Sequence, residues 1–171
     1  MRIIVDILAF GLIVYVTGAA GFAVAKRFTE RPRQLADLCL GLEVLRTEIV
    51  YAATPLATAL ATLRMRAPLG EFFVHAAEGI ASLKTARSAW EDALPVLVKQ
   101  SALLEPDLAA LRHLGEVLGT SNREDQERHL LVVLRRLESL QREAEAEARR
   151  SATLWRYLGV LSGITLVIIL I

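Results

Sequence analysis

Hydrophobic positions divide the chain into two apolar ends and a long middle part in which apolar residues recur at helical spacing. The apolar ends run from Ile3 to Ala25 and from Leu154 to Ile171. As a helix, the first segment would be roughly 34 Å long, enough to cross a hydrocarbon core of about 30 Å. The second segment is shorter, so it spans a bilayer only with Trp155 and Tyr157 at the membrane interface. The pattern predicts a transmembrane helix at each end.

Basic residues near these two segments predict the orientation of the chain. They are Lys26, Arg27, Arg31 and Arg33 after the first segment, and Arg142, Arg149, Arg150 and Arg156 before or within the second. Such residues remain on the cytoplasmic side of a membrane. We therefore expect an N-terminal transmembrane helix at residues 1–25, a cytosolic domain at 26–153 and a C-terminal transmembrane helix at 154–171, all in the cell membrane.

A cleaved signal peptide is the competing interpretation of the first segment. Arg2, the apolar run and the sequence Ala23-Val24-Ala25 match the three regions of such a peptide. However, the apolar run is long for a signal peptide, and cleavage would leave a basic stub facing outward. The sequence therefore favours a membrane anchor.

The middle part predicts an all-α domain of six helices, the last of which is long. Apolar residues recur at three- and four-residue intervals, and the alternation typical of strands is absent. The first helix is expected to begin near Pro32. The six apolar stripes are Leu35, Leu38, Leu42, Leu45 and Ile49; Leu56, Ala59, Leu60 and Leu63; Leu69, Phe72, Phe73, Ala76, Ala77 and Ile80; Ala86, Ala89, Trp90, Ala93, Leu94 and Leu97; Leu108, Leu111, Leu114 and Leu118; and Leu130, Leu134, Leu137, Ala144 and Ala148.

Proline, glycine and capping residues predict the ends of the first four helices. Thr54 is expected to cap the second helix, with Pro55 in its first turn. Gly79 is placed to help end the third helix. Pro95 removes a backbone donor within the fourth helix, so we expect a kink or an end near Leu94.

The last two helices have similar signals. Pro106 opens the fifth helix, and Gly119 is placed to close it in the left-handed conformation. Ser121 and Glu124 form a capping-box pattern. Neither proline nor glycine occurs between Ser121 and Leu158. We therefore expect one helix that continues into the second membrane segment.

Composition and charge exclude several classes of function. A content of 54% hydrophobic residues suits a membrane protein, but 23% charged residues are too many for a polytopic transporter. The net charge of +1 gives no reason to expect nucleic acid as a partner. Cys39 is the only cysteine, so an intrachain disulfide is excluded.

No catalytic or cofactor motif stands out in the sequence. A phosphate-binding loop that ends in Lys-Ser or Lys-Thr is absent, which makes intrinsic ATPase activity unexpected. Asp125 and His129 have the one-turn spacing of two metal ligands, but no second pair accompanies them. Cys39 on the first helix is expected to be a packing residue. We therefore predict a non-enzymatic protein without cofactor or metal. The alternative is a small membrane enzyme that uses Asp125 and His129.

Two segments resemble the stage III sporulation protein AB family of endospore-forming bacteria. They are Arg31-Pro32-Arg33-Gln34-Leu35 and the stretch from Leu118 to Gln126, LGTSNREDQ. The resemblance extends over nearly the full length and includes Glu48 and Tyr51, Thr54-Pro55 with Leu56 and Ala59, Ala86, Ala89 and Trp90, and Arg156-Tyr157-Leu158-Gly159. Asn122 stands where the family commonly has Asp, and both residues suit a helix start.

The resemblance implies a role in assembly. Proteins of this family belong to the membrane apparatus that joins the mother cell to the forespore, which is similar to secretion machines. Their soluble domain is similar to the six-helix domain of the type II secretion platform protein F. By analogy, this chain would dock a cytosolic ATPase, stage III sporulation protein AA, to other membrane subunits of the channel, in the mother-cell membrane around the forespore.

A docking role points first to the polar residues of the resembling segments. The candidate partner-binding residues are Arg31, Arg33, Gln34, Glu48, Asn122, Arg123, Glu124, Gln126 and His129. Membrane contact and helix capping are structural alternatives for several of them. A rival interface is homotypic, through the Ala-rich stretch from Arg142 to Arg150. The alternative function is a generic self-associating tether unrelated to sporulation.

Overall fold

The computed structural model describes residues 16, 19, 29–119 and 123–170, without the side chains of 123, 152–156, 158–160 and 162–170. The chain forms two compact units. One unit is Arg33–Arg142, and the other combines Met1–Pro32 with Glu143–Ile171.

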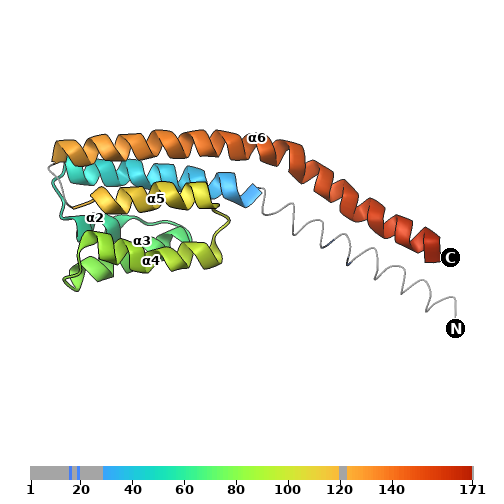
Figure 1. The fold of residues 1–171 in the computed structure, drawn as a ribbon, viewed down its shortest axis with the longest axis horizontal. Coiled ribbons are helices and arrows are strands. Elements are labelled where there is room, and N and C mark those ends of the chain that lie inside the picture. The colour runs from blue at the N-terminus through green and yellow to red at the C-terminus, as the bar shows by residue number, and fades with distance from the viewer. Residues whose placement is uncertain (1–15, 17–18, 20–28, 120–122, 171) are drawn as a thin grey trace. The chain divides into compact units, whose positions relative to one another are not determined.

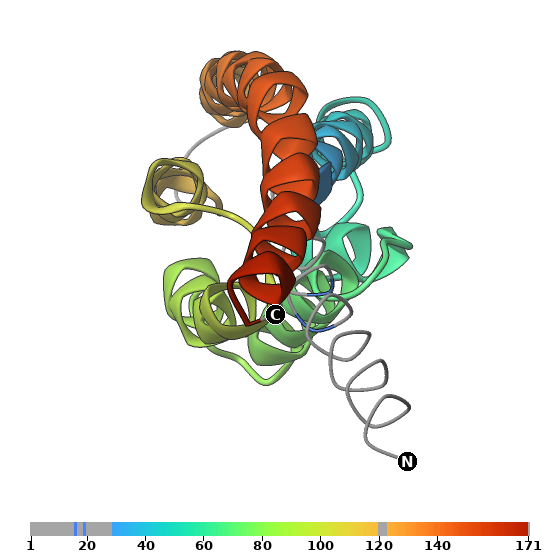
Figure 2. The ribbon, with the colours of Figure 1, turned by 90° about the vertical axis from the view of Figure 1, so that its right-hand side faces the viewer.

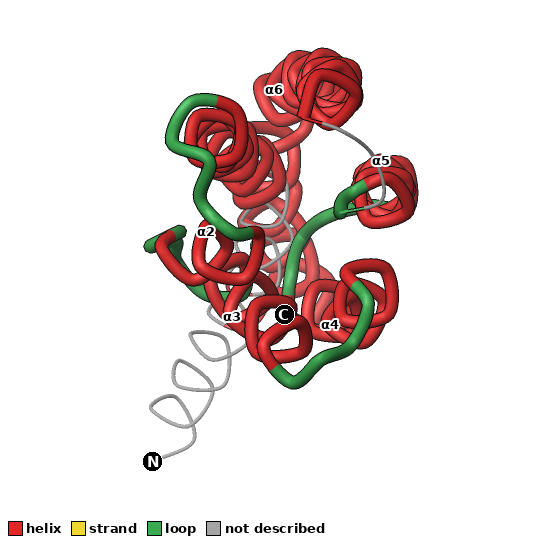
Figure 3. Tube along the Cα trace, turned by 90° about the vertical axis from the view of Figure 1, so that its left-hand side faces the viewer, coloured by secondary structure: helices red, strands yellow, loops and turns green. Residues whose placement is uncertain are grey.

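The described part of the chain is all-α and contains six helices, as predicted. The first covers residues 29–50 and is followed by α2 (Leu56–Thr62), α3 (Leu69–Ala81), α4 (Ala86–Gln100), α5 (Glu105–Val117) and α6 (Arg123–Leu170) (Figure 1). Within the unit Arg33–Arg142, the helices surround a common core, as the end-on views in Figure 2 and Figure 3 show. Around this core the order is α2, helix 29–50, α6, α5, α4 and α3.

The predicted apolar stripes form this core. Leu35, Leu38, Leu42 and Leu45 of helix 29–50 are fully buried. The largest buried side chain is Trp90, whose ring contacts those of Phe72 and Phe73 edge to face, with centroid distances of 4.9 and 5.9 Å. The stripe residues of α3 and α6 are all buried except Ile80 and Ala148, which are half-buried. Helical periodicity therefore identified the buried faces of these elements correctly.

Two helix boundaries differ from the prediction. Helix 29–50 already includes the three residues before Pro32, so it begins earlier than expected. At α2, Pro55 is the N-cap and no side chain caps the helix. The Thr54 hydroxyl instead donates to the Glu48 carboxylate at 2.6 Å, because that acceptor lies within reach across the turn. The predicted capping role of Thr54 is wrong.

Two predicted helix breakers lie inside helices. Gly79 does not end α3, which continues to Ala81. A Cβ atom at Gly79 would lie 2.7 Å from the Cβ of Ala89, so the missing side chain allows α3 and α4 to approach closely. Pro95 is exposed within α4, which continues to Gln100, so the helix does not end near Leu94.

The ends of α5 and the course of α6 match the prediction. Pro106 lies at the start of α5, and Gly119 after its end has a φ of +75°. The long last helix runs without interruption from Arg123 to Leu170. Ser121, the first residue of the predicted capping box, lies outside the described residues.

The two predicted membrane segments stay predictions. The first, residues 1–25, lies outside the described residues except for positions 16 and 19. The second continues α6 as a helix. In the part of the chain that the structure describes, no helix has the length and apolarity needed to cross a membrane.

Candidate functional site

The predicted docking residues lie in two groups at different ends of helix 29–50. Gln34 and Glu48 are fourteen positions apart on this helix, which corresponds to about 21 Å. Arg31 and Arg33 accompany Gln34, and the residues at the start of α6 lie nearer to the Glu48 end, where α6 runs beside helix 29–50 (Figure 1). The predicted set therefore does not form one continuous surface.

Two residues of the first group have structural contacts. Gln34 is half-buried, and its Oε1 accepts a hydrogen bond from the backbone N–H of Ala102 at 2.8 Å. It thereby ties helix 29–50 to the connection between α4 and α5. Arg31 has 12% of its side chain exposed and lies 3.8 Å from the Glu147 carboxylate. Arg33 is exposed and remains available for a partner.

Glu48 also has a structural role. Its carboxylate accepts from the Thr54 hydroxyl at 2.6 Å, and its backbone carbonyl accepts from the Thr54 N–H at 2.9 Å. These two bonds close the turn between helix 29–50 and α2. Glu48 is half-buried and is therefore only partly accessible to a partner.

At the start of α6, the predicted docking residues differ in exposure. Glu124 is exposed, whereas Gln126 and His129 are half-buried. The His129 ring lies edge to face with that of His113 on α5, with 6.2 Å between centroids. Asn122 lies outside the described residues, and the side chain of Arg123 is not described. A partner-binding role for the whole set stays a prediction.

The structure reveals a row of exposed arginines on α6 that the sequence analysis did not single out. Arg128, Arg135 and Arg142 recur every seven residues, so they share one face of the helix, and Arg136 lies beside them. Arg128 lies 3.5 Å from Asp125. Among the described side chains, no carboxylate lies within 4.0 Å of the guanidinium groups of Arg135, Arg136 and Arg142. We call these four residues the α6 arginine row.

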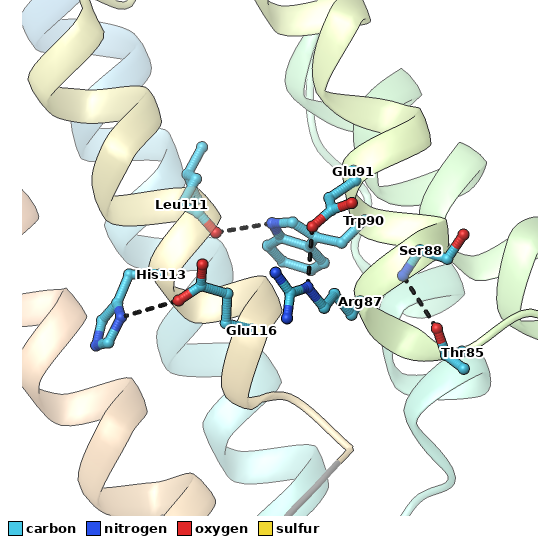
Figure 4. Close-up of polar contacts among 8 residues, drawn as sticks. All are labelled: Thr85, Arg87, Ser88, Trp90, Glu91, Leu111, His113 and Glu116. Atoms are coloured by element: carbon cyan, nitrogen blue, oxygen red, sulfur yellow. Dashed lines mark hydrogen bonds and ion pairs between the residues drawn. The ribbon is translucent and has the colours of Figure 1, made fainter.

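Several charged residues at the start of α4 and on α5 are instead paired locally. Lys84 contacts Asp92 at 2.6 Å, and Arg87 contacts Glu91 at 3.0 Å, as Figure 4 shows for the second pair. The hydrogen bond from Arg112 lowers the pKa of the Glu105 carboxyl group. The α6 arginine row differs from these pairs, because three of its cations lie near one another on one helix without such a partner. The seven-residue spacing was the sequence signal that could have revealed it.

The candidate catalytic residues have plain surroundings. Burial raises the pKa of the Cys39 thiol to about 11, with smaller contributions from Glu138 and Glu43. A thiol in this state is a poor nucleophile at neutral pH. Within the described ranges, no three His, Cys, Asp or Glu side chains are placed to hold a metal ion. The absence of enzymatic activity stays a prediction.

Comparison with known proteins gives one consistent result. A family model described as stage III sporulation protein AB matches residues 6–171. The chain belongs to the stage III sporulation protein AB family. The family member of Bacillus subtilis (strain 168) is 32% identical over 161 residues, which cover 92% of this chain and 94% of that protein.

A solved structure of a family member supports the fold. This structure, of stage III sporulation protein AB, has a TM-score of 0.66 and 30% identity, and it covers 70% of this chain and 96% of that chain. The predicted membership of the stage III sporulation protein AB family is therefore confirmed. The chain is a homologue of a component of the sporulation machinery.

Proposed function

We propose that this chain is a non-enzymatic membrane platform of the channel between mother cell and forespore. Its helical domain would dock a cytosolic secretion-type ATPase, stage III sporulation protein AA, to the other membrane subunits. The observation that carries the proposal is the match to the stage III sporulation protein AB family over residues 6–171. The all-α bundle is also what a resemblance to the type II secretion platform protein F requires.

The proposed anchor is a pair of membrane helices at the two apolar ends, with the domain in the cytoplasm. One contact supports this arrangement. Arg31 precedes the bundle, Glu147 follows it, and their side chains lie 3.8 Å apart. The two chain segments that lead to the apolar ends therefore run side by side, as a two-span anchor requires. Exposed arginines at 149 and 150 agree with a cytoplasmic position before the second span.

The orientation can be tested with one introduced cysteine. In a Cys39→Ser background, Ser82→Cys places a thiol at an exposed turn of the domain. With the chain expressed in the plasma membrane of vegetative cells, whose outer face is open to the medium, we expect a membrane-impermeant maleimide to label it only after the cells are permeabilised. Labelling in intact cells would place the domain outside the cytoplasm and contradict the proposal.

The α6 arginine row is the surface that best fits ATPase docking. Arg135 and Arg142 are exposed cations on a rigid helix, and no described carboxylate neutralises them. Charged side chains of this kind steer association and fix the register of an interface. The row also continues from Glu124, the exposed residue at the predicted docking site.

Charge reversal tests this surface. The double variant Arg135→Glu/Arg142→Glu should retain the helical fold, lose ATPase binding and lower the yield of heat-resistant spores. Lys99→Glu is the matched control, because Lys99 is an exposed cation on α4 without a carboxylate within 4.0 Å among the described residues. Arg33→Glu examines the other predicted group. Equal binding by the double variant and the wild type would exclude the row as the docking surface.

A further inference from the structure

The turn between α3 and α4 contains a leucine where glycine would be expected. The N–H of Leu83 donates to the carbonyl of Ile80 at 3.0 Å, and the N–H of Lys84 donates to the carbonyl of Gly79 at 3.2 Å. This pair of bonds is the Schellman motif, which ends a helix with one residue in the left-handed conformation. Leu83 is that residue, with a φ of 65°. Glycine adopts this conformation without steric cost, whereas leucine does not.

Burial does not explain the leucine. Leu83 is 96% exposed, the highest value among the large hydrophobic residues whose side chains the structure describes. A bulky apolar residue therefore occupies a position that is unfavourable for its backbone and for its solvation in the isolated chain. Residues of this kind concentrate at functional contacts, where the partner supplies the missing stabilisation.

A hollow lies directly beside the exposed leucine. It is a cavity of about 230 Å³ that is open to solvent, and Ser82 and Lys84, the two neighbours of Leu83, contribute to its wall. Gly79, Ala89 and Ala93 supply small groups between α3 and α4. A cavity of about 150 Å³ accommodates a benzene ring, so an isobutyl group has room here.

The hollow is preformed rather than dependent on a partner. A Cβ atom at Gly79 would lie 2.7 Å from the Cβ of Ala89, so the two helices are in close contact at its base. Lys84 and Asp92, which line the hollow, neutralise each other at 2.6 Å.

We propose that two copies of this chain associate through the α3–α4 turn, with Leu83 of each copy inserted into the hollow of the other. A two-fold interface requires that a surface be complementary to itself, so both the protruding group and its receptor must lie on the same patch. Leu83 and the hollow satisfy this condition, because they share the same turn. The contact is small, and it would act together with the other contacts of a membrane assembly. This proposal does not depend on ATPase docking.

Three variants of the full chain, purified in mild detergent, separate the side chain from its backbone strain. Leu83→Ala removes the side chain, and Leu83→Gly removes both the side chain and the strain. Both should weaken dimerisation by about tenfold or more, as loss of a buried leucine predicts. Only Leu83→Gly should also raise the melting temperature.

Ala53→Gly is the matched control, because Ala53 is the other described non-glycine residue at positive φ, with a φ of 54°. This variant should raise the melting temperature without affecting dimerisation. Sedimentation velocity measures the dimer fraction.

A mixing experiment tests the reciprocal geometry. His75 is exposed and lines the hollow, so His75→Trp should block the hollow while Leu83 is retained. Each single variant, His75→Trp or Leu83→Ala, should be mainly monomeric alone. Mixed together, they should form a heterodimer, because the leucine of the first can enter the open hollow of the second.

The outcomes decide the proposal. A wild-type chain that stays monomeric at the highest soluble concentration would overturn it. A wild-type dimer that Leu83→Ala leaves intact would also overturn it and would point instead to another homotypic surface, such as residues 142–150 of α6. Heterodimer formation by the two variants, with none by either alone, would establish the contact.

Discussion

Trp90 illustrates what could be predicted at the scale of single residues. Its helical spacing placed it in the core, and it is 1% exposed. The sequence did not reveal its partners, because they come from residues distant in the chain. The indole N–H donates to the Leu111 carbonyl at 2.8 Å, across from α4 to α5 (Figure 4). Gly115 of α5 leaves room for the ring, because a Cβ atom at this position would lie 2.3 Å from the indole.

Gly115→Ala is therefore expected to destabilise the domain. Helix propensity alone would favour alanine by about 1 kcal/mol. The collision with the buried Trp90 ring should reverse that sign and cost about 1–3 kcal/mol in free energy of unfolding, as overpacking does. Urea denaturation measures the change. Glu116→Ala, at the exposed next position, is the control and should stay within about 0.5 kcal/mol of the wild type. A stabilised Gly115→Ala variant would show that the ring is not held against α5.

Cys39 makes a pH-dependent prediction. Folding raises the pKa of the thiol from 9.0 to about 11, mainly by burial. The fold therefore favours the protonated thiol, and this contribution to stability is fully present below about pH 9 and is lost as pH rises through about 11. At pH 8, alkylation of the native chain by iodoacetamide should be about a hundredfold slower than alkylation of the urea-unfolded chain. Equal rates would contradict the buried environment of Cys39.

At the scale of elements, periodicity predicted the helices well and their connections poorly. Apolar spacing within a helix is a local property, so it revealed the faces of helix 29–50 and α3 to α6. The connections depend on groups that meet only in the fold. Thr54 resembles a cap in sequence, but the carboxylate of Glu48 lies closer to its hydroxyl. Pro95 can remain inside α4 because it lies on the exposed side.

Gln34 gives the sharpest test of such a connection. The resemblance motif suggests docking, but its amide oxygen accepts from the N–H of Ala102. Gln34→Ala should therefore lower the free energy of unfolding by about 1 kcal/mol, because a partly buried N–H loses its acceptor. Arg33→Ala is the matched control, since the neighbouring Arg33 is exposed and its loss should leave stability nearly unchanged. Equal stability of both variants and the wild type would return Gln34 to the candidate docking residues.

At the scale of the whole molecule, the sequence predicted the family and the helix count but not a continuous site. The predicted docking residues lie in two groups: Gln34 is about 21 Å along helix 29–50 from Glu48, and the residues at the start of α6 lie nearer to the Glu48 end. Adjacency in a motif says little about which side chains already have partners inside the fold. Gln34 and Glu48 do, whereas Arg135 and Arg142 have no described carboxylate within 4.0 Å. Arg135 and Arg142 also share one face of α6, and this combination adds the α6 arginine row to the candidate docking residues.

The most direct test of the central claim is binding between the full chain in proteoliposomes and the stage III sporulation protein AA ATPase of the same genome, with and without nucleotide. The account predicts saturable binding that depends on Arg135 and Arg142 and that survives Lys99→Glu. Absence of binding to a folded, helical chain would contradict a role in ATPase docking and would direct the search to the other membrane subunits of the channel.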